Sequence, residues 1–482
     1  MIKKLNTKIL IFLISIIIIS GYLLISTIIG NDKFKNLKLL LNYEHRQLIK
    51  KYIFPYKVIT EKQKVIFLQE HIINLTFPNL ELKDKENDIQ IETHKKTKKL
   101  FKSLCTSLNH VVCHVTPSER ILDDKTLDKY KLISGFYAGI QKNFPGSGYI
   151  DFYEGNIIVM SSRGILAFKK NIEDVKENFK QIKNNINEFI GINQFKKRIW
   201  FSLKDIFIFN NKVFISYTEE IKEDCWNTSV IYGDMNYENI EFEKLFSAKE
   251  CIHSTKNIDK QFNAHQSGGK IISFNDNHIL LSIGDYRSRH LAQDIKSVNG
   301  KIIKVNIDNG NYEIISMGHR NPQGLYFDKE NNLILETEHG PMGGDEINLI
   351  EVSKINEDKI QNYGWAISSA GEHYGGKIEA NKKIYEKYPL YKSHIEQGFI
   401  EPLKSFVPSI AISEIVKVEQ NKYVVSSMID KSLYFFELNE QKQIINLDRV
   451  EVFERVRDLN FNNNQLYLFM EDTASIGVIS LN

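Results

Sequence analysis

Apolar and polar residues alternate in a unit that recurs six times along the chain. Each unit has an apolar run, a tight turn of Asn, Asp, Glu or Gly, and a second apolar run, which is typical of a β-hairpin. The units begin at Ile150, Asp205, Ile271, Leu325, Ile415 and Leu459. Because an isolated hairpin is only marginally stable in water, repeated hairpins stack on one another. The pattern therefore predicts an all-β fold, a six-bladed β-propeller.

The residues that flank the hairpins are the first candidates for chemistry. The residue before the first strand and the residue after the second lie at the same edge of a hairpin. If the hairpins are the inner pairs of radially arranged blades, their flanks meet at one mouth of an axial channel. The candidates in these flanks are His265, Arg320, Glu338, Gly340, Arg455 and Arg457. Glycines there can serve turns alone, but an imidazole and three guanidiniums favour a ligand site.

Two segments interrupt the hairpin pattern. Residues 169–189 have helical spacing and many charges, which predicts a helix on the surface. The longest gap between hairpins, residues 350–406, contains the aromatic and glycine-rich stretch NYGWAISSAGEHYGG. This stretch is too long for a simple connection, and we expect it to contribute to function.

The N-terminus predicts a membrane anchor. The stretch from Ile9 to Ile29 contains no charged residue and follows three lysines, and a run of about 20 apolar residues spans a bilayer. No small-x-small cleavage site follows it, which favours an uncleaved transmembrane helix in residues 1–30 over a removed signal peptide. Residues 31–130 lack the hairpin pattern and are predicted to be a partly helical extension next to the membrane. The propeller is assigned to residues 131–482.

The four cysteines and the net charge bear on the compartment and the partners. The cysteines form two sequence-close pairs, Cys105 with Cys113 and Cys225 with Cys251, which fits two disulfides; four separate buried thiols fit the same count. Neither pair has the spacing of a zinc site. With the anchor, disulfides predict a single-pass inner-membrane protein whose body faces the oxidising, periplasmic side. A formal net charge of +3 does not indicate nucleic-acid binding.

Several motifs resemble those of one enzyme family. They are HQSGG from His265, GHRNPQG from Gly318, HGPMGGDEINL from His339, NYGW from Asn362 and RVRD from Arg455. In this order they resemble the soluble quinoprotein glucose/sorbosone dehydrogenases, which are pyrroloquinoline quinone (PQQ)-dependent sugar dehydrogenases on six-bladed propellers. The resemblance covers residues 260–482, and the first two blades share only the hairpin pattern.

The resemblance implies PQQ and Ca²⁺ as cofactors and an aldose or related hydroxyl compound as substrate. PQQ has three carboxylates, which guanidinium groups bind in pairs of hydrogen bonds. The implied cofactor-binding residues are Arg320, Asn321, Arg455 and Arg457. The implied metal ligands are Gly340 and Pro341 for the cofactor calcium, and Glu346 and Tyr363 for a second calcium. His265 is the implied general base, which takes the hydroxyl proton as hydride passes to the quinone. The electron acceptor is not identified.

The sequence also departs from the family. Ala264 stands where relatives commonly have an acidic residue, and Tyr286 where glucose-oxidising relatives have a glutamine. The family's cofactor lysine has only loose candidates, Lys417 and Lys431. These departures leave an alternative open, a non-catalytic propeller that binds sugar or calcium and is tethered to the membrane.

Overall fold

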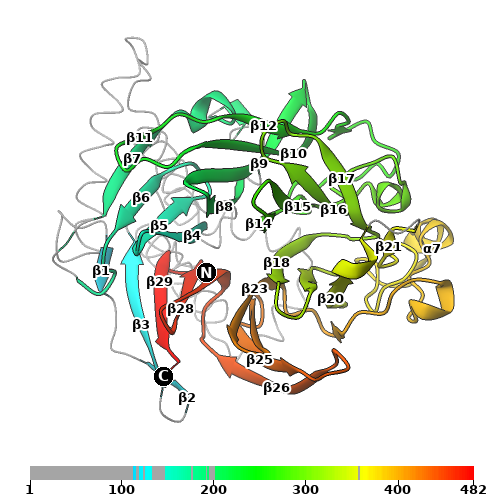
Figure 1. Ribbon diagram of the computed structural model, residues 1–482. Coiled ribbons are helices and arrows are strands. Elements are labelled where there is room, and N and C mark those ends of the chain that lie inside the picture. The colour runs from blue at the N-terminus through cyan, green and yellow to red at the C-terminus, as the bar shows by residue number, and fades with distance from the viewer. Residues whose placement is uncertain are drawn as a thin grey trace, which may run out of the picture. The chain divides into compact units, whose positions relative to one another are not determined.

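Six β-sheets stand around a common axis (Figure 1). The computed structural model describes residues 112–114, 119–122, 125–132, 147–174, 177, 179–191, 193–194, 201–355 and 359–481. The predicted anchor Ile9–Ile29, Cys105 and most of the predicted extension lie outside these residues. Within them, no helix has the length and apolar character needed to cross a membrane.

Each sheet is one blade, built from the axis outward. Blade 1 contains β4 (Gly148–Tyr153), β5 (Asn156–Ser161), β6 (Leu166–Lys169) and β7 (Lys180–Asn184), with β11 (Asn239–Ile240) beside β7. Blade 2 contains β8 (Leu203–Phe209), β9 (Lys212–Lys222), β10 (Cys225–Asp234) and β12 (Glu243–Ser247), with β13 (Ile252–His253) on β10. Blade 3 contains β14 (Gly268–Asn275), β15 (His278–Ile283), β16 (Lys301–Asn306), β17 (Tyr312–Met317) and β21 (Gln361–Asn362).

The other three blades repeat the plan. Blade 4 contains β18 (Pro322–Asp328), β19 (Leu333–Glu338), β20 (Asp345–Glu351) and β22 (Lys404–Phe406). Blade 5 contains β23 (Ile412–Glu419), β24 (Lys422–Ser427), β25 (Ser432–Leu438) and β26 (Ile444–Glu451). Blade 6 contains β27 (Val456–Asn462), β28 (Gln465–Met470), β29 (Ser475–Ser480) and β3 (Lys125–Leu132), with β1 (Val112–His114) and β2 (Glu119–Leu122) on β3.

The ring of blades is closed, as the hairpin repeat predicts. The inner strands contact one another in the cyclic order β4, β8, β14, β18, β23, β27 and back to β4, and the six predicted hairpins are the six inner strand pairs. The last blade is completed by β3, which pairs with β29 in a register that sets Tyr130 opposite Ile476. Blade 6 therefore includes residues that precede residue 131, with β3 from Lys125 and β1 from Val112.

The helix predicted over residues 169–189 is wrong. The segment contains β7, the outer strand of blade 1, followed by a short 3-10 turn, η3 (Ile186–Glu188). Ile182 is fully buried opposite Leu166, whereas Lys180 and Lys183 are exposed. The short alternation of an edge strand, completed by pairing with β6, overrides the helical spacing of the charged residues.

Apolar side chains fill the space between neighbouring sheets. Between blades 2 and 3, for example, Phe214 and Val230 pack with Ile279, Leu281 and Ile303. A disulfide joins Cys225 on β10 to Cys251, with the Cα atoms 5.3 Å apart. This pairing is one of the two predicted from the sequence.

A long excursion leaves blade 3 after β21 and returns at β22. It contains the 3-10 turns η6 (Glu379–Asn381) and η7 (Ile395–Gln397) and the single turn α7 (Lys382–Lys387). Two other 3-10 turns, η4 (Arg289–Gln293) and η5 (Val352–Lys354), follow β15 and β20. The excursion is fixed by Trp365, whose indole Nε1 donates to Asp285 Oδ2 at 2.8 Å and whose carbonyl accepts from Gln293 Nε2 at 2.6 Å. The NYGW stretch thus packs on the loop that follows β15.

Candidate active site

Hydroxyl groups join neighbouring blades at the end where the inner strands begin, which we call the mouth end. Ser282, at the end of β15, donates from Oγ to the carbonyl of Pro322 at 3.1 Å. Thr337, at the end of β19, donates to the carbonyl of Ser413 at 2.6 Å. Ser216 on β9 donates in the same way to the carbonyl of Gly269. These hydrogen bonds between neighbouring blades hold the flanks of different hairpins at one end of the propeller.

His265 lies in the mouth-end loop before β14. Its backbone N–H donates to Asn263 Oδ1 at 2.9 Å, and the next residue, Gln266, accepts at its carbonyl from Tyr286 N–H at 2.9 Å. Burial, followed by the nearby charges of Lys204 and Arg457, lowers the pKa of His265 from 6.5 to about 3. The imidazole is therefore neutral at physiological pH and can accept a proton.

Arg455 and Arg457 share one carboxylate, that of Glu471 after β28. Arg455 Nε donates to Glu471 Oε2 at 2.9 Å, and Arg457 donates to Oε1 from Nε at 2.9 Å and from Nη2 at 2.7 Å. Although burial opposes ionisation, the two guanidiniums, Arg457 foremost, lower the pKa of Glu471. The two arginines lie on one face of the strand, as alternation requires, while Val456 between them is buried in the core.

A hydrogen-bond path connects the loop of His265 with Arg457 across blade 4. Asn321 Oδ1 accepts from Gly268 N–H at 3.2 Å and from Gln323 Nε2 at 3.1 Å. Gln323 Oε1 in turn accepts from Arg457 Nη1 at 3.4 Å. The path brings the predicted base, Asn321 and Arg457 to one mouth.

Arg320 lies beside the Gly-Pro turn that follows β19. Its Nη1 donates to the carbonyl of His339 at 2.7 Å, and its guanidinium lies 5.4 Å from the ring centroid of Trp365 and 5.9 Å from that of Tyr374. Because the two rings contact the face of the planar guanidinium of Arg320, the N–H groups along its edge can bind a ligand.

The turn at Gly340 and Pro341 is fixed by Asp345. Asp345 Oδ1 accepts from Gly340 N–H at 3.0 Å and from Ser409 Oγ at 2.9 Å, and the Ser409 hydroxyl also lies 3.4 Å from the carbonyl oxygen of Pro341. A Cβ at position 340 would lie 2.0 Å from the carbonyl oxygen of Gly344. Only glycine fits this turn.

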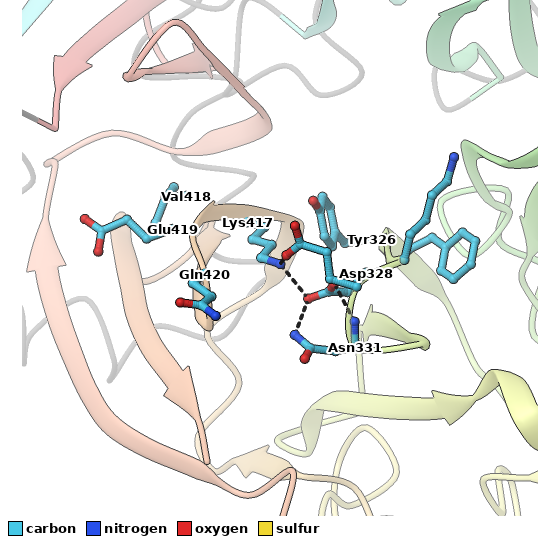
Figure 2. A pocket seen from close by; sticks show the side chains of 10 residues that line it. Tyr326, Asp328, Asn331, Lys417, Val418, Glu419 and Gln420 are labelled. Carbon is cyan, nitrogen blue, oxygen red and sulfur yellow. Dashed lines mark hydrogen bonds and ion pairs between the residues drawn. The ribbon is translucent and has the colours of Figure 1, made fainter. Parts of the chain in front are cut away.

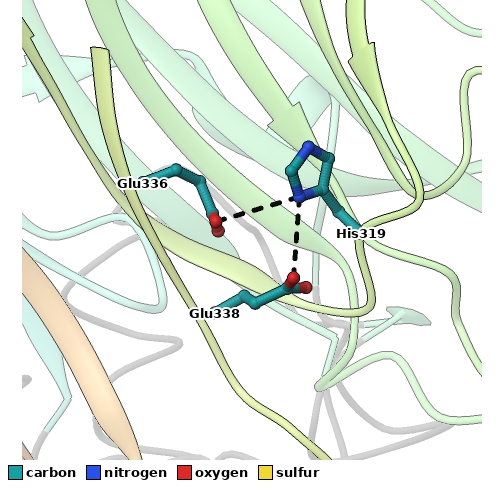
Figure 3. Close-up of side chains that lie close together, drawn as sticks. All are labelled: His319, Glu336 and Glu338. Atoms are coloured by element: carbon teal, nitrogen blue, oxygen red, sulfur yellow. Dashed lines mark ion pairs between the residues drawn. The ribbon is translucent and has the colours of Figure 1, made fainter. Parts of the chain in front are cut away.

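Glu346 and Tyr363 belong to a buried cluster of carboxylates, of which Figure 3 shows His319, Glu336 and Glu338. Asn348 Nδ2 donates to Glu336 Oε2 at 3.0 Å, to Glu338 Oε1 at 3.2 Å and to Glu346 Oε2 at 3.4 Å. His319 Nδ1 lies 3.8 Å from Glu336 Oε2 and 3.6 Å from Glu338 Oε1. The carbonyl of Tyr363 lies 2.9 Å from His394 Nδ1. We call these residues the carboxylate cluster: His319, Glu336, Glu338, Glu346, Asn348, Tyr363 and His394.

The donor set of the carboxylate cluster fits a bound cation. Burial, and then the charge of Glu338, raises the pKa of both Glu336 and Glu346 far above the usual value. Four buried polar atoms of the cluster make no hydrogen bond: His319 Nδ1, Glu336 Oε1, Asn348 Oδ1 and His394 Nε2. Buried carboxylates that repel one another beside unsatisfied polar atoms are costly unless a cation or protons compensate.

Glu338 differs from its predicted place among the mouth residues. Its Oε2 accepts from the backbone N–H of Arg320 at 2.5 Å, whereas Oε1 faces His319 in the carboxylate cluster. The side chain therefore connects the arginine to the cluster. Its position after the second strand of a hairpin was the expected one, but the direction of its side chain depends on the partners from β20 and blade 3.

Neither loose candidate for the cofactor lysine is among the groups around His265. Lys417 lies 3.0 Å from Asp328 Oδ2 and 2.7 Å from Glu330 Oε2. Figure 2 shows it in a hollow of about 800 Å³ at the turn ends of blades 4 and 5, opposite to the mouth end. Lys431 pairs with Asp472 at 2.6 Å. Tyr286 is fully buried, with its hydroxyl 2.8 Å from Thr228 Oγ1, and so belongs to the core.

Two cations at the mouth end were missed by sequence reasoning. Arg163 follows β5 and Lys204 lies near the start of β8, and Lys204 Nζ donates to the carbonyl of Ala264 at 3.2 Å. The edge rule that selected His265 and Arg320 selects these two as well when it is applied to the first two hairpins. Glu471, at the end of the sixth hairpin, follows from the same rule.

The chain matches a family and several known proteins. The model of the glucose/sorbosone dehydrogenase family matches residues 201–479. An uncharacterized protein of Synechocystis is 28% identical over 223 residues, which is 40% of this chain and 50% of that protein. The aldose sugar dehydrogenase YliI of Escherichia coli is 24% identical over 291 residues, which is 55% of this chain and 71% of that protein. The chain thus spans half of the first of these relatives and somewhat more of the second.

A solved structure supports the fold. The PQQ-bound aldose sugar dehydrogenase of Streptomyces coelicolor superposes with a TM-score of 0.51 at 16% identity, over 69% of this chain and 93% of that one. At this identity the likeness concerns the architecture alone.

Proposed function

The chain belongs to the glucose/sorbosone dehydrogenase family, a family of oxidoreductases, and from this we propose that it oxidises an aldose or a related hydroxyl compound with PQQ and Ca²⁺ at the mouth of the propeller. One observation carries the proposal. A neutral imidazole, that of His265, lies at the same end as the guanidiniums of blades 4 and 6, and the loop that carries it is hydrogen-bonded at Gly268 through Asn321 and Gln323 to Arg457. This combination provides a proton acceptor next to groups that bind carboxylates.

His265 acts as the general base. It accepts the proton of the substrate hydroxyl at its neutral ring nitrogen, while the carbon that bears this hydroxyl gives up hydride. PQQ, when bound, supplies the two-electron acceptor. Arg320, Asn321, Arg455 and Arg457 would hold the cofactor, the guanidiniums through its carboxylates, and Glu471 keeps Arg455 and Arg457 in position.

Two cation sites accompany the cofactor. The carbonyls of Gly340 and Pro341 are the ligands for the calcium at the cofactor, in a turn adjacent to Arg320. Glu346 and the carbonyl of Tyr363, with Glu336 and Glu338, hold a second calcium, since oxygen donors suit this ion.

If calcium occupies this second site, a chelator lowers the melting temperature of the wild type. In Glu336→Gln, which lacks one carboxylate, the chelator then has a smaller effect. A wild type whose melting temperature does not respond to chelation or calcium contradicts the second site.

Reconstitution tests the proposal. The purified full-length chain is loaded with PQQ and Ca²⁺, and dye reduction is measured with a panel of aldoses. We expect PQQ absorbance to change on binding and dye to be reduced with at least one sugar. Failure to bind PQQ refutes the proposal and favours the non-catalytic, sugar- or calcium-binding alternative, which the replacement of an acidic residue by Ala264 also favours. The panel and the dye stand in for a substrate and an electron acceptor that are not identified.

The disulfide between Cys225 and Cys251 supports a location of the propeller in an oxidising compartment. We place the body on the periplasmic side of the inner membrane, with the stretch Ile9–Ile29 as the anchor. The anchor stays a prediction from the sequence. Fractionation of cells, followed by alkaline extraction of the membranes, distinguishes an anchored chain from a released one.

A further inference from the structure

The two cations that sequence reasoning missed lie at the mouth end of blades 1 and 2, and one of them, Lys204, contacts the residue before His265. Lys204 Nζ donates to the carbonyl of Ala264, the residue directly before His265. Arg163 is 3% exposed, and its Nη1 donates at 2.5 Å to the carbonyl of Phe201, in the segment that leads into β8. Blades 1 and 2 therefore each direct a cation to the His265 side of the mouth end.

The position of Lys204 is built into the inner strands. Gly269 at the start of β14 has φ +122°, and a Cβ there would lie 2.3 Å from Lys204 Cβ. The absence of a side chain at this glycine lets the stem of the lysine pass against blade 3. The carbonyl of Gly269 is held by the hydroxyl of Ser216, so the contact is part of the joint between blades 2 and 3.

The cations around His265 repel one another. Burial, and then the charges of Arg457 and Arg163, lowers the pKa of Lys204 to about 7. Lys204 and Arg457 in turn lower the pKa of His265. An anion placed among these groups relieves the repulsion, because each close cation-to-anion contact in a partly desolvated site is favourable. Arg457 of blade 6 is paired with Glu471, so the ligand we consider for this group is an anion that contacts Arg163 and Lys204 of blades 1 and 2.

We propose that Arg163 and Lys204 form a carboxylate-binding subsite beside His265, additional to the four residues assigned to PQQ. A guanidinium and an ammonium are the usual partners of a carboxylate. The carboxylate comes either from PQQ or from a substrate that is itself a sugar acid, such as a hexuronate. Ala264 fits the second source, since the acidic residue it replaces would repel an anionic substrate. The proposal rests on the proposed function for the reaction, but the subsite can be tested by binding alone.

Calorimetric titration tests the subsite, with PQQ plus Ca²⁺ and D-glucuronate as separate probes on the full-length chain. In Lys204→Met we expect the affinity for at least one probe to fall by about tenfold or more, the scale of a charged hydrogen bond. Lys204→Arg keeps the charge and retains most of the affinity. Lys212→Met is the matched control, because Lys212 pairs with the exposed Asp234 at the turn end of the same blade. Thermal melting of each variant checks that it is folded.

The two probes separate the outcomes. A loss for PQQ assigns the subsite to the cofactor, and a loss for glucuronate alone assigns it to the substrate. If Lys204→Met binds both probes as the wild type does, or the wild type binds neither, the subsite is refuted. A wild type that binds glucuronate through Lys204 but does not bind PQQ keeps the subsite and refutes the proposed function. If the wild type binds PQQ and oxidises glucose, and Lys204→Met binds both probes with the same affinity as the wild type, the proposed function is kept and the subsite is refuted.

The pH dependence of binding is a second readout that needs only folded proteins. Lys204 loses its proton around pH 7, so the wild-type affinity falls between pH 6 and pH 9. Lys204→Arg stays charged and keeps its affinity over this range. Arg163, Arg457 and Glu471 stay charged over this range and His265 stays neutral. Asp205, the next residue of β8, has a pKa of about 7, but it is present in both proteins and so does not distinguish them. Identical pH dependence in the two proteins contradicts the subsite.

Discussion

The imidazole of His265 owes its state to its surroundings. An ordinary histidine is half protonated near pH 6.5, but burial, Lys204 and Arg457 hold the pKa of His265 at about 3. A bound carboxylate would offset part of the lowering of the His265 pKa that the cations cause. Burial is the larger cause of the low pKa and remains when the ligand binds. The base is therefore available well below neutral pH.

The pH profile of the PQQ-loaded enzyme reports this state directly. With saturating PQQ and a neutral aldose as substrate, we expect kcat/KM to show no acid limb between pH 8 and about pH 5, because His265 remains unprotonated over this range. An acid limb centred near 6.5 would mean that the base titrates as an ordinary histidine, and it would contradict the assignment. Circular dichroism at each pH checks that the protein stays folded.

Replacing the base separates chemistry from binding. In His265→Gln we expect kcat to fall by about 10²–10⁴-fold, the usual contribution of a general base. The affinity for PQQ stays within several-fold of the wild type, since the cofactor is held by the arginines. Single-wavelength titration gives the affinity and dye reduction gives the rate. Loss of PQQ binding in this variant would instead make the role of His265 structural.

Arg457 is the guanidinium with the most connections at the mouth end. Arg457→Ala removes its bonds to Glu471 and Gln323, and we expect PQQ binding to weaken by about 1.5–3 kcal/mol, the value of a charged hydrogen bond. Arg449→Ala is the control, because Arg449 on the outer strand β26 pairs with Asp430 away from the inner strands. Equal PQQ affinity in the two variants removes Arg457 from the site.

At the scale of elements, the ends of the second strands determine how well the mouth residues are aligned. Ser282 and Thr337 lie near the ends of β15 and β19, Ser216 lies within the longer β9, and each donates to the next blade. In Thr337→Val, which keeps the shape but not the hydroxyl, the carbonyl of Ser413 loses its partner. We expect a loss of about 1–3 kcal/mol in the free energy of unfolding. Thr255→Val, at an exposed hydroxyl, is the control and leaves the free energy unchanged.

The elements that the sequence predicts are those with local causes. The six inner hairpins follow from alternation and turn residues within a few positions, and the edge rule then places His265 and the arginines at one end. The pairing of β3 with β29 places Tyr130 opposite Ile476. A local sequence pattern cannot predict a contact between segments so far apart in the chain. The same holds for the carboxylate cluster, where Glu336 meets Asn348 only through the register of β19 and β20. Strand β7 was missed because its few alternating residues carry the charges of a surface helix.

At the scale of the whole molecule, one partly buried lysine, Lys270, contacts carboxylates from several inner strands near the axis. Lys270 Nζ lies 2.6 Å from Glu414 Oε2, 3.3 Å from Asp205 Oδ1 and 3.6 Å from Asp458 Oδ1. Two of these carboxylates also accept from the next inner strand, Asp205 from Ile271 N–H at 2.8 Å and Asp458 from Ile150 N–H at 2.7 Å. Blades 1, 2, 3, 5 and 6 thus meet around a single ammonium group. Such a network fixes the closure of the ring, because a gap at any blade would leave buried charge without a partner.

Lys270→Met tests this role through the pH dependence of stability. The side chain of methionine fills a similar volume but leaves three buried carboxylates without their cation, and we expect a loss of about 3–5 kcal/mol in the free energy of unfolding at pH 8. Burial already raises the pKa of Asp205 to about 7, and removing Lys270 raises it further. The folded variant then binds more protons than the unfolded chain, so its stability rises as the pH falls from 8 towards 5. Urea unfolding at pH 8 and pH 5.5 measures the difference, with Lys422→Met, an exposed pair with Glu419, as the control that moves neither midpoint. A loss of equal size at both pH values would show that packing, and not charge, is what Lys270 contributes at the axis.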